Sequence, residues 1–241
     1  MRYGIISDIH GNLEALDVAV RHLEAMGVDQ FVCLGDVVGY GADPNGCMNI
    51  VCGLTDMVVA GNHDHAAIGL TDLEHFNQYA KEAALWTART LDPAHREYIE
   101  TLPFVLSMEQ AMGVHATPYE PQRWAYLMTH YQFLASFGHF TEKVCFIGHS
   151  HQPVVYEKGE SSHGPRNDAK VSLVDGSRYI VNVGSVGQPR DNDSRLCCCI
   201  YDSGKMTVEL VRLEYNVGQA QEKIRQAGLP EFLAQRLAYG E

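Results

Sequence analysis

Residues 61–65, with the sequence Gly-Asn-His-Asp-His, place four polar or ionisable side chains directly after the largely apolar segment 56–60. Such side chains are costly to bury at the end of a strand unless something binds them. Other residues that can bind metal occur in four more places, nearly all just after an apolar strand: Asp8 and His10, Asp36, His115, and His149 with His151. The carboxyl ends of parallel strands form the crevice in which ligands collect, so these segments predict one shared site.

The ligand types in this set indicate which metals the site would take. It offers two carboxylates, several imidazoles and the side-chain amide of Asn62, and it offers no thiolate. Hard oxygen together with borderline nitrogen suits manganese, iron or zinc more than copper or an iron–sulfur cluster. Seven ligand residues are too many for one tetrahedral ion, so we expect two ions that share a carboxylate.

The order of these motifs carries a family resemblance. D-x-H at 8–10, G-D at 35–36, G-N-H-D at 61–64, the lone His115 and G-H-x-H at 148–151 resemble the calcineurin-like metallophosphoesterase superfamily. Further segments resemble a branch of small bacterial and archaeal phosphoesterases, so that the resemblance covers nearly the whole chain: 35–44, 181–191 and 227–237. The resemblance implies an α/β fold, a four-layer αββα sandwich of two mixed β-sheets with flanking helices.

The resemblance also implies a role for each motif residue. Asp8, His10 and His151 would hold the first ion, and Asn62, His115 and His149 would hold the second. Asp36 and a solvent oxygen would bridge the two ions. His63 would be the catalytic histidine that contacts the phosphate, beside Asn62, and protonates the leaving group. The expected cofactors are two divalent transition-metal ions, manganese foremost, with iron, zinc or nickel as alternatives.

Physical chemistry gives these roles independent reasons. Two cations roughly 3.5–4 Å apart can clamp the attacking and leaving oxygens of an in-line phosphoryl displacement. A bound metal lowers the pKa of water from roughly 15.7 to about 7 in the best-studied zinc case. A bridging hydroxide is therefore expected at neutral pH. The bridging residue must be an anion, which suits Asp36. Asn62 supplies an oxygen without charge, which leaves the site net positive for a phosphate.

Near the predicted ligands, the sequence leaves more than one interpretation open at three places. Asp64 either orients His63 in catalysis or hydrogen-bonds to backbone at a helix start. Arg190, in the segment 182–190, either clamps phosphate beside a nest of backbone N–H groups or lies in a turn on the rim of the site. Protein Ser/Thr phosphatases of the superfamily carry an Asp and an Arg where this chain has Gly39 and Tyr40. That difference disfavours a protein phosphatase and leaves open how His63 is held.

The elements that must position these residues alternate between strand and helix. The first half reads as strands at 2–7, 30–35 and 56–60, with a helix over 12–27 that Asn12 caps and Gly27 ends. Short strands resume after residue 103, and the tail 216–239 reads as two short helices. We expect one domain, 1–241, with helical inserts at 65–101 and 121–138. The polar segment 158–170 is predicted to be a loop.

Composition narrows the function further. The formal net charge of −12 argues against a broad basic surface for nucleic acid. No run approaches the ~18 consecutive apolar residues of a membrane span, and the first residues lack the apolar stretch of a signal peptide. The odd number of cysteines, seven, fits a reducing compartment. We therefore expect a cytoplasmic protein whose partner is a small phosphorylated substrate, and its oligomeric state stays open.

The leading hypothesis from the sequence is a dinuclear-metal phosphoesterase. It would hydrolyse a small phosphodiester or phosphomonoester by direct attack of the bridging hydroxide. The alternatives are a protein phosphatase and a catalytically weak metal-binding scaffold. One relative, a retromer subunit, keeps this fold for interactions, but a scaffold can lose ligands, and this chain retains all seven and His63.

Overall fold

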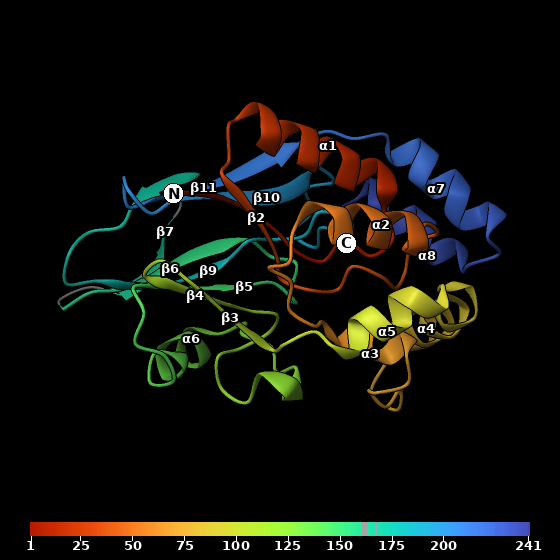
Figure 1. Cartoon of the computed structure of the whole chain (residues 1–241), viewed down its shortest axis with the longest axis horizontal. Coiled ribbons are helices and arrows are strands. Elements are labelled where there is room, and N and C mark those ends of the chain that lie inside the picture. The colour runs from red at the N-terminus through yellow and green to blue at the C-terminus, as the bar shows by residue number, and fades with distance from the viewer. Residues whose placement is uncertain (161–162, 167) are drawn as a thin grey trace.

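The computed structural model describes residues 1–160, 163–166 and 168–241. Two mixed β-sheets pack face to face, and helices cover their outer faces. In Figure 1, helix α1 (Leu13–Ala25) lies over one sheet and helix α6 (His130–Ser136) lies under the other. The predicted four-layer αββα sandwich is confirmed.

The first sheet contains the strands that precede Asp8 and Asp36. Its spatial order is β2 (Gln30–Cys33), β1 (Arg2–Ile6), β10 (Leu196–Asp202), β11 (Thr207–Leu213) and β8 (Lys170–Ser172). Strands β1 and β2 are parallel, with Ile5 opposite Val32, whereas β1 and β10 are antiparallel. The parallel pair brings the carboxyl ends of β1 and β2 to the same edge.

The second sheet contains the strands that precede His115 and His149. Its spatial order is β3 (Val105–Met108), β4 (Ala111–Val114), β5 (Val144–Ile147), β9 (Arg178–Asn182), β6 (Val154–Lys158) and β7 (His163–Arg166). Strand β5 runs parallel to both β4 and β9. The ends of β4 and β5 therefore also lie at one edge.

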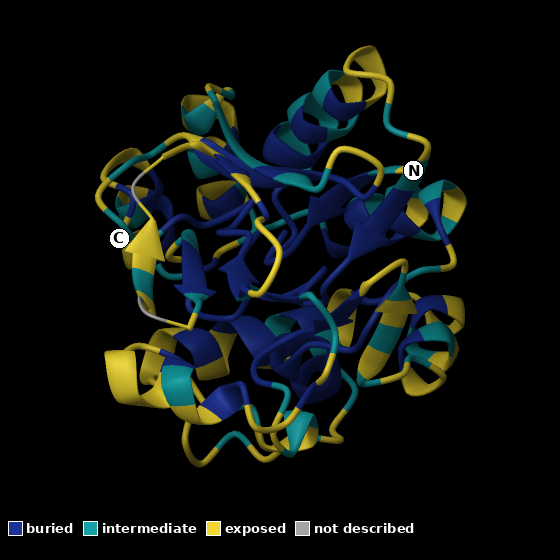
Figure 2. Cartoon of the chain, turned by 90° about the vertical axis from the view of Figure 1, so that its left-hand side faces the viewer, coloured by how far each residue is buried: buried dark blue, intermediate teal, exposed yellow. Residues whose placement is uncertain are grey.

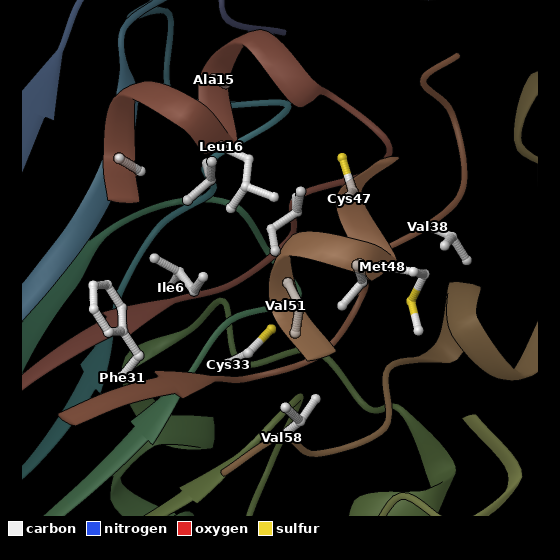
Figure 3. Close-up of a cluster of buried hydrophobic side chains, with 14 of the residues drawn as sticks. Ile6, Ala15, Leu16, Phe31, Cys33, Val38, Cys47, Met48, Val51 and Val58 are labelled. Carbon is white, nitrogen blue, oxygen red and sulfur yellow. The ribbon is translucent and has the colours of Figure 1, made fainter. Parts of the chain in front are cut away.

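The core follows from the alternation of side chains along each strand. Ile5 of β1 packs between the two sheets with Phe146 and Tyr201, whereas its neighbour Ile6 points to the helices outside. Figure 3 shows this outer cluster, in which Leu16 of α1 and other apolar side chains converge on the sheet. Figure 2 shows the same arrangement over the chain, with buried strands inside and partly exposed helices and loops around them.

Helix α1 forms where the sequence predicts it. The side chain of Asn12 accepts a hydrogen bond from the backbone N–H of Ala15, which caps the helix as expected. Leu16 and Leu23 are fully buried on one face. Gly27, just beyond the helix, adopts a left-handed backbone with φ +66°, which stops the helix.

Of the other helices, one packs beside α1 on the first sheet, and the rest lie near the edge where these strands end or in the tail. They are α2 (Pro44–Leu54), α3 (Asn62–Ala67), α4 (Gln78–Thr90), α5 (Pro93–Glu100), α7 (Val217–Gln226) and α8 (Glu231–Gln235), with 3₁₀ turns at Pro121–Arg123 and Arg236–Ala238. The two tail helices match the prediction for 216–239. Among the described residues, none of the helices has both the length and the apolar character that crossing a membrane requires.

Two predictions for the first half of the chain are wrong in part. The expected strand at 56–60 is reduced to one parallel bridge between Val58 and Cys33, because Ala60 donates its N–H to Pro103 instead of continuing along β2. The insert 65–101 is not helical throughout. Helix α3 ends before Gly69, which has φ +81°, and the next helix, α4, begins only at Gln78 behind the capping side chain of Asn77.

Two predictions for the second half also change. The insert 121–138 is helical only at its ends, and the segment 124–129 between them is irregular. The expected loop 158–170 contains strand β7, which pairs with β6. Residues 161–162 and 167 of that predicted loop lie outside the described residues.

Candidate metal centre

The predicted site residues converge from both sheets. Asp8 and His10 follow β1, and Asp36 follows β2, all in the first sheet. His115 follows β4, and His149 and His151 follow β5, in the second sheet. Asn62 and His63 begin helix α3, which closes the same edge. The structure therefore brings together all the residues that the motifs singled out for metal binding.

The backbone at these positions is unusual. Left-handed backbone with positive φ occurs at five of the predicted ligands: Asp8 (52°), His10 (50°), Asp36 (51°), His149 (65°) and His151 (58°). For residues other than glycine this conformation costs on the order of 1–3 kcal/mol each and clusters at functional sites. The fold accepts this cost repeatedly in order to turn these side chains toward one another.

One group of side chains gathers around Asp8. Its Oδ1 atom lies 3.2 Å from Nε2 of His151 and 3.8 Å from Nε2 of His10. The two imidazole Nε2 atoms are 3.2 Å apart. All three side chains are buried, and their ligand atoms lie within 4.8 Å of one another. One cation can reach all three atoms.

A second group gathers around His115. Its Nε2 atom lies 3.3 Å from Oδ2 of Asp36, 3.2 Å from Nδ1 of His149 and 3.1 Å from Oδ1 of Asn62. The ligand atoms of Asp36, His115 and His149 also lie within 4.8 Å of one another. Asp36 faces the first group as well, because its Oδ2 atom is 3.7 Å from Nε2 of His10. This carboxylate therefore lies between the two groups.

Hydrogen bonds fix the orientation of three imidazoles. Nδ1 of His10 faces the carbonyl of Val38 at 3.1 Å, and Nδ1 of His115 faces the carbonyl of Leu34 at 2.7 Å. Nδ1 of His151 faces the carbonyl of Gln188 at 2.5 Å. Since a carbonyl only accepts, each Nδ1 carries a proton, and Nε2 is the ring nitrogen that faces the group.

Two buried ligand atoms lack hydrogen-bond partners among the described residues. They are Oδ1 of Asp8 and Oδ2 of Asp36. Burying a carboxylate oxygen without a partner is costly, and a carboxylate and an imidazole lone pair are ligands for a divalent transition metal. The donor set and its unpartnered atoms therefore fit two divalent cations.

The pKa values of the cation-free protein also indicate that the buried carboxylates require positive charge nearby. Burial lowers the pKa of His10, His149 and His151, that of His149 to about 3, so these imidazoles are neutral. Burial also acts against a charge on His115, but the nearby Asp36 carboxylate raises the pKa of His115 to about 9. In turn, His115 lowers the pKa of Asp36 well below its usual range. A proton on His115 supplies the positive charge that the carboxylates require in the absence of cations.

His63 lies beside both groups, and none of the described residues forms a hydrogen bond to its ring. Its imidazole packs edge-on against His10, with ring centroids 4.9 Å apart, and against the rings of Tyr40 and Phe76 at 4.4 and 4.8 Å. Its Nδ1 atom is buried with no described partner. A Cβ atom on Gly39 would lie only 2.9 Å from that nitrogen. Aromatic packing, in space left open by Gly39, therefore holds the histidine here.

Asp64 is bonded to backbone. Its Oδ2 atom accepts from the N–H groups of Asp36 and Gly61 at 2.8 and 3.1 Å, and its Oδ1 atom accepts from Val38 at 3.1 Å. These bonds match the structural interpretation of Asp64, and none of the described bonds joins it to His63. Burial and the nearby Asp36 charge raise the pKa of Asp64 to about 7.

The segment 182–190 lies beside the candidate metal centre. The N–H groups of Val186 and Gly187 donate to the carbonyls of Ser7 and Asp8, so these two are not free to form a phosphate nest. The Arg190 guanidinium donates to Oε1 of Gln188 and lies 5.5 Å from the centroid of the Tyr40 ring. Arg190 thus stays near His63 through Tyr40, as a phosphate contact would require.

Sequence reasoning missed two residues of this site. Phe76 packs on His63 from the segment 68–77, which was expected to be helical. Gln188 orients His151 through its backbone carbonyl, which no side-chain pattern can indicate. Of the aromatic residues in the inserts, Tyr126 reaches the centre, and its ring stacks on His149 with centroids 4.0 Å apart.

Comparison with known proteins agrees with this geometry. A curated protein of Methanocaldococcus jannaschii, uncharacterized protein MJ0912, is 36% identical over 241 residues, which cover 98% of this chain and 97% of that protein. The crystal structure of a metallophosphoesterase from Sphaerobacter thermophilus matches with a TM-score of 0.88 and 37% identity, over 100% of this chain and 99% of the other. Hypothetical protein PH1004 from Pyrococcus horikoshii OT3 shares the fold, with a TM-score of 0.82 and 18% identity over 100% and 98% of the two chains.

The family itself is identified by a match to a family model. The model of the calcineurin-like phosphoesterase superfamily domain matches residues 1–205, a range that contains every predicted metal ligand. The chain belongs to the calcineurin-like phosphoesterase superfamily.

Proposed function

We propose that this protein hydrolyses a small phosphodiester or phosphomonoester with the help of two divalent cations. Family membership supports a phosphoric ester hydrolase. The observation that carries the proposal is the pair of buried ligand groups that meet at Asp36, with unpartnered carboxylate oxygens of Asp8 and Asp36 among the described residues.

Each group has a complete set of ligands for one cation. Asp8, His10 and His151 would hold the first, and Asn62, His115 and His149 the second, with Asp36 shared. Bound there, the two cations supply an ionised water as nucleophile at neutral pH and stabilise the charge of the phosphoryl oxygens. Nitrogen and carboxylate ligands without thiolate favour manganese, with iron, zinc and nickel as alternatives.

The chain's own residues bind the phosphate and handle the proton. His63 and Asn62 lie at the same end of α3, where both can contact a phosphate oxygen. Burial, helped by the charge of Arg190, lowers the pKa of His63 to about 4, so its imidazole is neutral before substrate binds. An adjacent phosphate anion raises the proton affinity of the imidazole. In this complex His63 takes up a proton from solvent and gives it to the leaving oxygen, and Arg190 contacts the phosphate from the rim.

The role of Asp64 in this scheme is indirect. Its three bonds to backbone hold the segment that carries Asp36 against the start of α3. We therefore propose that Asp64 serves catalysis by positioning Asp36 and not by touching the substrate.

We also propose a substrate type, a cellular location and a domain organisation for this protein. The net charge of −12 supports a small phosphorylated substrate over a nucleic-acid polymer. The seven free cysteines, of which all but Cys52 are buried, support a cytoplasmic location. A buried cluster joins Tyr40 to residues of α4, α7 and α8, which supports one domain over 1–241.

Metal analysis combined with an activity panel tests the proposed function. Purified protein loaded with manganese should hold close to two ions per chain and hydrolyse p-nitrophenyl phosphate, bis-p-nitrophenyl phosphate, or both. Chelation should abolish hydrolysis, and added manganese should restore it. A fully active sample that holds one ion or none would contradict the two-cation proposal, and a loaded sample inactive on every phosphoester would favour the scaffold alternative.

A further inference from the structure

A cavity of about 230 Å³ opens directly onto the candidate metal centre. Asn62, His63 and His149 form its floor, so any molecule in it lies next to the phosphate position proposed above. The cavity is large enough to hold a chemical group that the phosphate carries.

Aromatic rings form a large part of the wall of this cavity, beside polar side chains such as Thr71 and Arg123. Tyr40, Phe76, Trp124 and Tyr126 line it. Among the described lining residues the only aliphatic side chain is Ala80, and there is no leucine, isoleucine, valine or methionine. A second cavity, of about 300 Å³, mixes the aromatic rings of Phe133 and Tyr156 with the aliphatic side chains of Leu127, Met128 and Val154. Among these described residues, the cavity at the centre thus differs by its lack of long aliphatic side chains.

The rings are held with their positions fixed. Tyr126 stacks on His149 at an interplanar angle of 24°, while its side chain is still 47% exposed toward the cavity and solvent. Trp124 packs against His65 and Phe104, with ring centroids 5.5 and 5.6 Å away. Phe76 contacts His63 on the other side. These centroid distances lie in or close to the range that favours aromatic pairs, about 4.5–7 Å.

The backbone that presents Trp124 is strained. Its φ is +55°, in the left-handed region that a bulky residue rarely adopts. Strain of this kind persists only where the surrounding structure enforces it, and it clusters at ligand clamps and active sites. Burial of Trp124 in a core does not explain it, because the residue is only half-buried.

Hydrogen-bonding groups stand at the rim of the aromatic walls. Asn77 uses its side-chain oxygen to cap α4 through Ala80, and its NH₂ group, which has no described partner, can donate to a ligand. Oδ1 of Asp72 accepts from the N–H of Glu74, and its other carboxylate oxygen can accept from a ligand. Flat apolar faces with a few polar groups at the edge suit a heteroaromatic ring and not an alkyl chain.

We propose that the cavity walled by Tyr126, Trp124 and Phe76 binds a planar heteroaromatic group of nucleobase size, so that the substrate is a nucleotide-type phosphoester. The assignment of the substrate class rests on the proposed phosphoesterase function, whereas binding of the ring can be tested without any hydrolysis. The ring stacks on Tyr126 and Trp124, the edge of the ring meets Asn77 and Asp72, and the attached phosphate reaches the metal centre.

The tryptophan content of the chain permits a direct test. Trp86 and Trp124 are the only tryptophans, and Trp86 lines a different cavity, beside α4 and the segment 228–230. Trp86→Phe therefore leaves Trp124 as the sole fluorescent reporter. Zinc-loaded Trp86→Phe protein is titrated with adenosine, which has the ring but no phosphoester bond, and with ribose, which lacks the ring. Adenosine should change the fluorescence saturably, and ribose should not.

Two further variants on this background locate the contact. Tyr126→Leu keeps an apolar side chain but removes the ring, and it should weaken adenosine binding by roughly 5- to 160-fold, the range for loss of base–aromatic stacking. Tyr131→Leu is the matched control, because Tyr131 is 83% exposed and lies outside the cavity. The affinity of the Tyr131→Leu variant for adenosine should equal that of the Trp86→Phe protein without it.

A pair of diesters with the same leaving group gives a second readout. Wild-type protein should have a higher kcat/KM for thymidine 5′-p-nitrophenyl phosphate than for methyl p-nitrophenyl phosphate, and Tyr126→Leu should reduce that ratio. No saturable response to adenosine, or unchanged affinity in Tyr126→Leu, would overturn the aromatic site even if both esters are hydrolysed. Adenosine binding without hydrolysis of either ester would instead refute the proposed function and leave the ring site standing.

Discussion

The backbone N–H of His63 donates to Oδ1 of Asp36 over 2.8 Å. The proposed catalytic histidine thus holds one oxygen of the proposed bridging carboxylate, and the other oxygen, Oδ2, faces both ligand groups. The metal-binding and phosphate-binding parts of the centre are therefore coupled through one short contact. Each of the following predictions perturbs one part of this arrangement.

Asp36→Asn should lower activity by orders of magnitude and also lower the metal content. An amide keeps the size of the side chain but removes the negative charge that offsets two neighbouring cations. Elemental analysis and kcat/KM on the same sample check this. Asp17→Asn, which removes an exposed carboxylate on α1, is the control and should change neither quantity. Full two-ion occupancy with normal turnover in Asp36→Asn would place the bridge elsewhere.

His63→Ala should reduce hydrolysis most where the leaving oxygen is basic. General acid catalysis contributes about 10²–10⁴-fold, and a p-nitrophenolate leaves readily without a proton. The loss should therefore be smaller on p-nitrophenyl phosphate than on methyl phosphate, with metal content unchanged. Equal losses on both esters would assign His63 to phosphate binding alone. Loss of a metal ion would make His63 a ligand.

Asp64→Asn should behave differently from His63→Ala. An asparagine can accept with only one side-chain oxygen, so at least one of the bonds to the N–H groups of Asp36, Gly61 and Val38 is lost. We expect a lower melting temperature, weaker metal retention and equal losses on both esters. If instead the loss depends on the leaving group as it does in His63→Ala, then Asp64 acts through the imidazole.

Gly39→Ala should impair catalysis without emptying the metal sites. The new Cβ would lie 2.9 Å from Nδ1 of His63, and the backbone of Gly39 has φ +90°. We expect kcat to fall by at least tenfold on methyl phosphate because the imidazole is displaced. Gly53→Ala is the matched control, since a Cβ there meets nothing within 4 Å and alanine favours the α2 helix. Normal turnover in Gly39→Ala would show that the position of His63 is not critical.

Glu157 should contribute stability that acid removes. Burial acts to raise its pKa, but hydrogen bonds from Ser177 and Tyr179 and the pairing with Arg166 lower the pKa below the ordinary value of 4.5. For a carboxyl group with a lowered folded pKa, the stabilisation is present above the unfolded value and is lost as the pH falls through the folded value. Glu157→Gln should therefore reduce the free energy of unfolding by about 1–3 kcal/mol at pH 7.

The comparison with wild type should shift with pH in a defined direction. In urea denaturation of metal-free protein, the difference between wild type and Glu157→Gln should stay constant above the unfolded pKa and shrink as the pH falls below 4.5. A difference that grows in acid would mean that the carboxyl group is protonated in the folded protein.

Local sequence pattern predicts the positions of the candidate ligands well, because each stands at the end of a strand or at a helix start. Asp8 after β1 and His149 after β5 need only the strand itself to be recognised. The pairing of the two sheets, and hence the grouping of His151 with Asp8, follows from the family resemblance and not from spacing.

Other parts of the centre depend on tertiary structure and are invisible in the pattern. The carbonyl groups that orient His10, His115 and His151 come from backbone far along the chain. Segments 68–77 and 124–129 belong to inserts predicted to be helical, but they are irregular and place aromatic side chains at the cavity instead. Helix propensity is weak enough for such tertiary contacts to override it.

Each ligand group takes side chains from both sheets, and this has a mechanical consequence. In the first group Asp8 and His10 come from the end of β1, and His151 comes from the end of β5. A cation held there would cross-link the two sheets, so its binding free energy would add to the free energy needed to separate them. Cation loading should therefore slow amide exchange in β1 and β5 together. The ions that serve the chemistry would also set how long the sandwich stays closed.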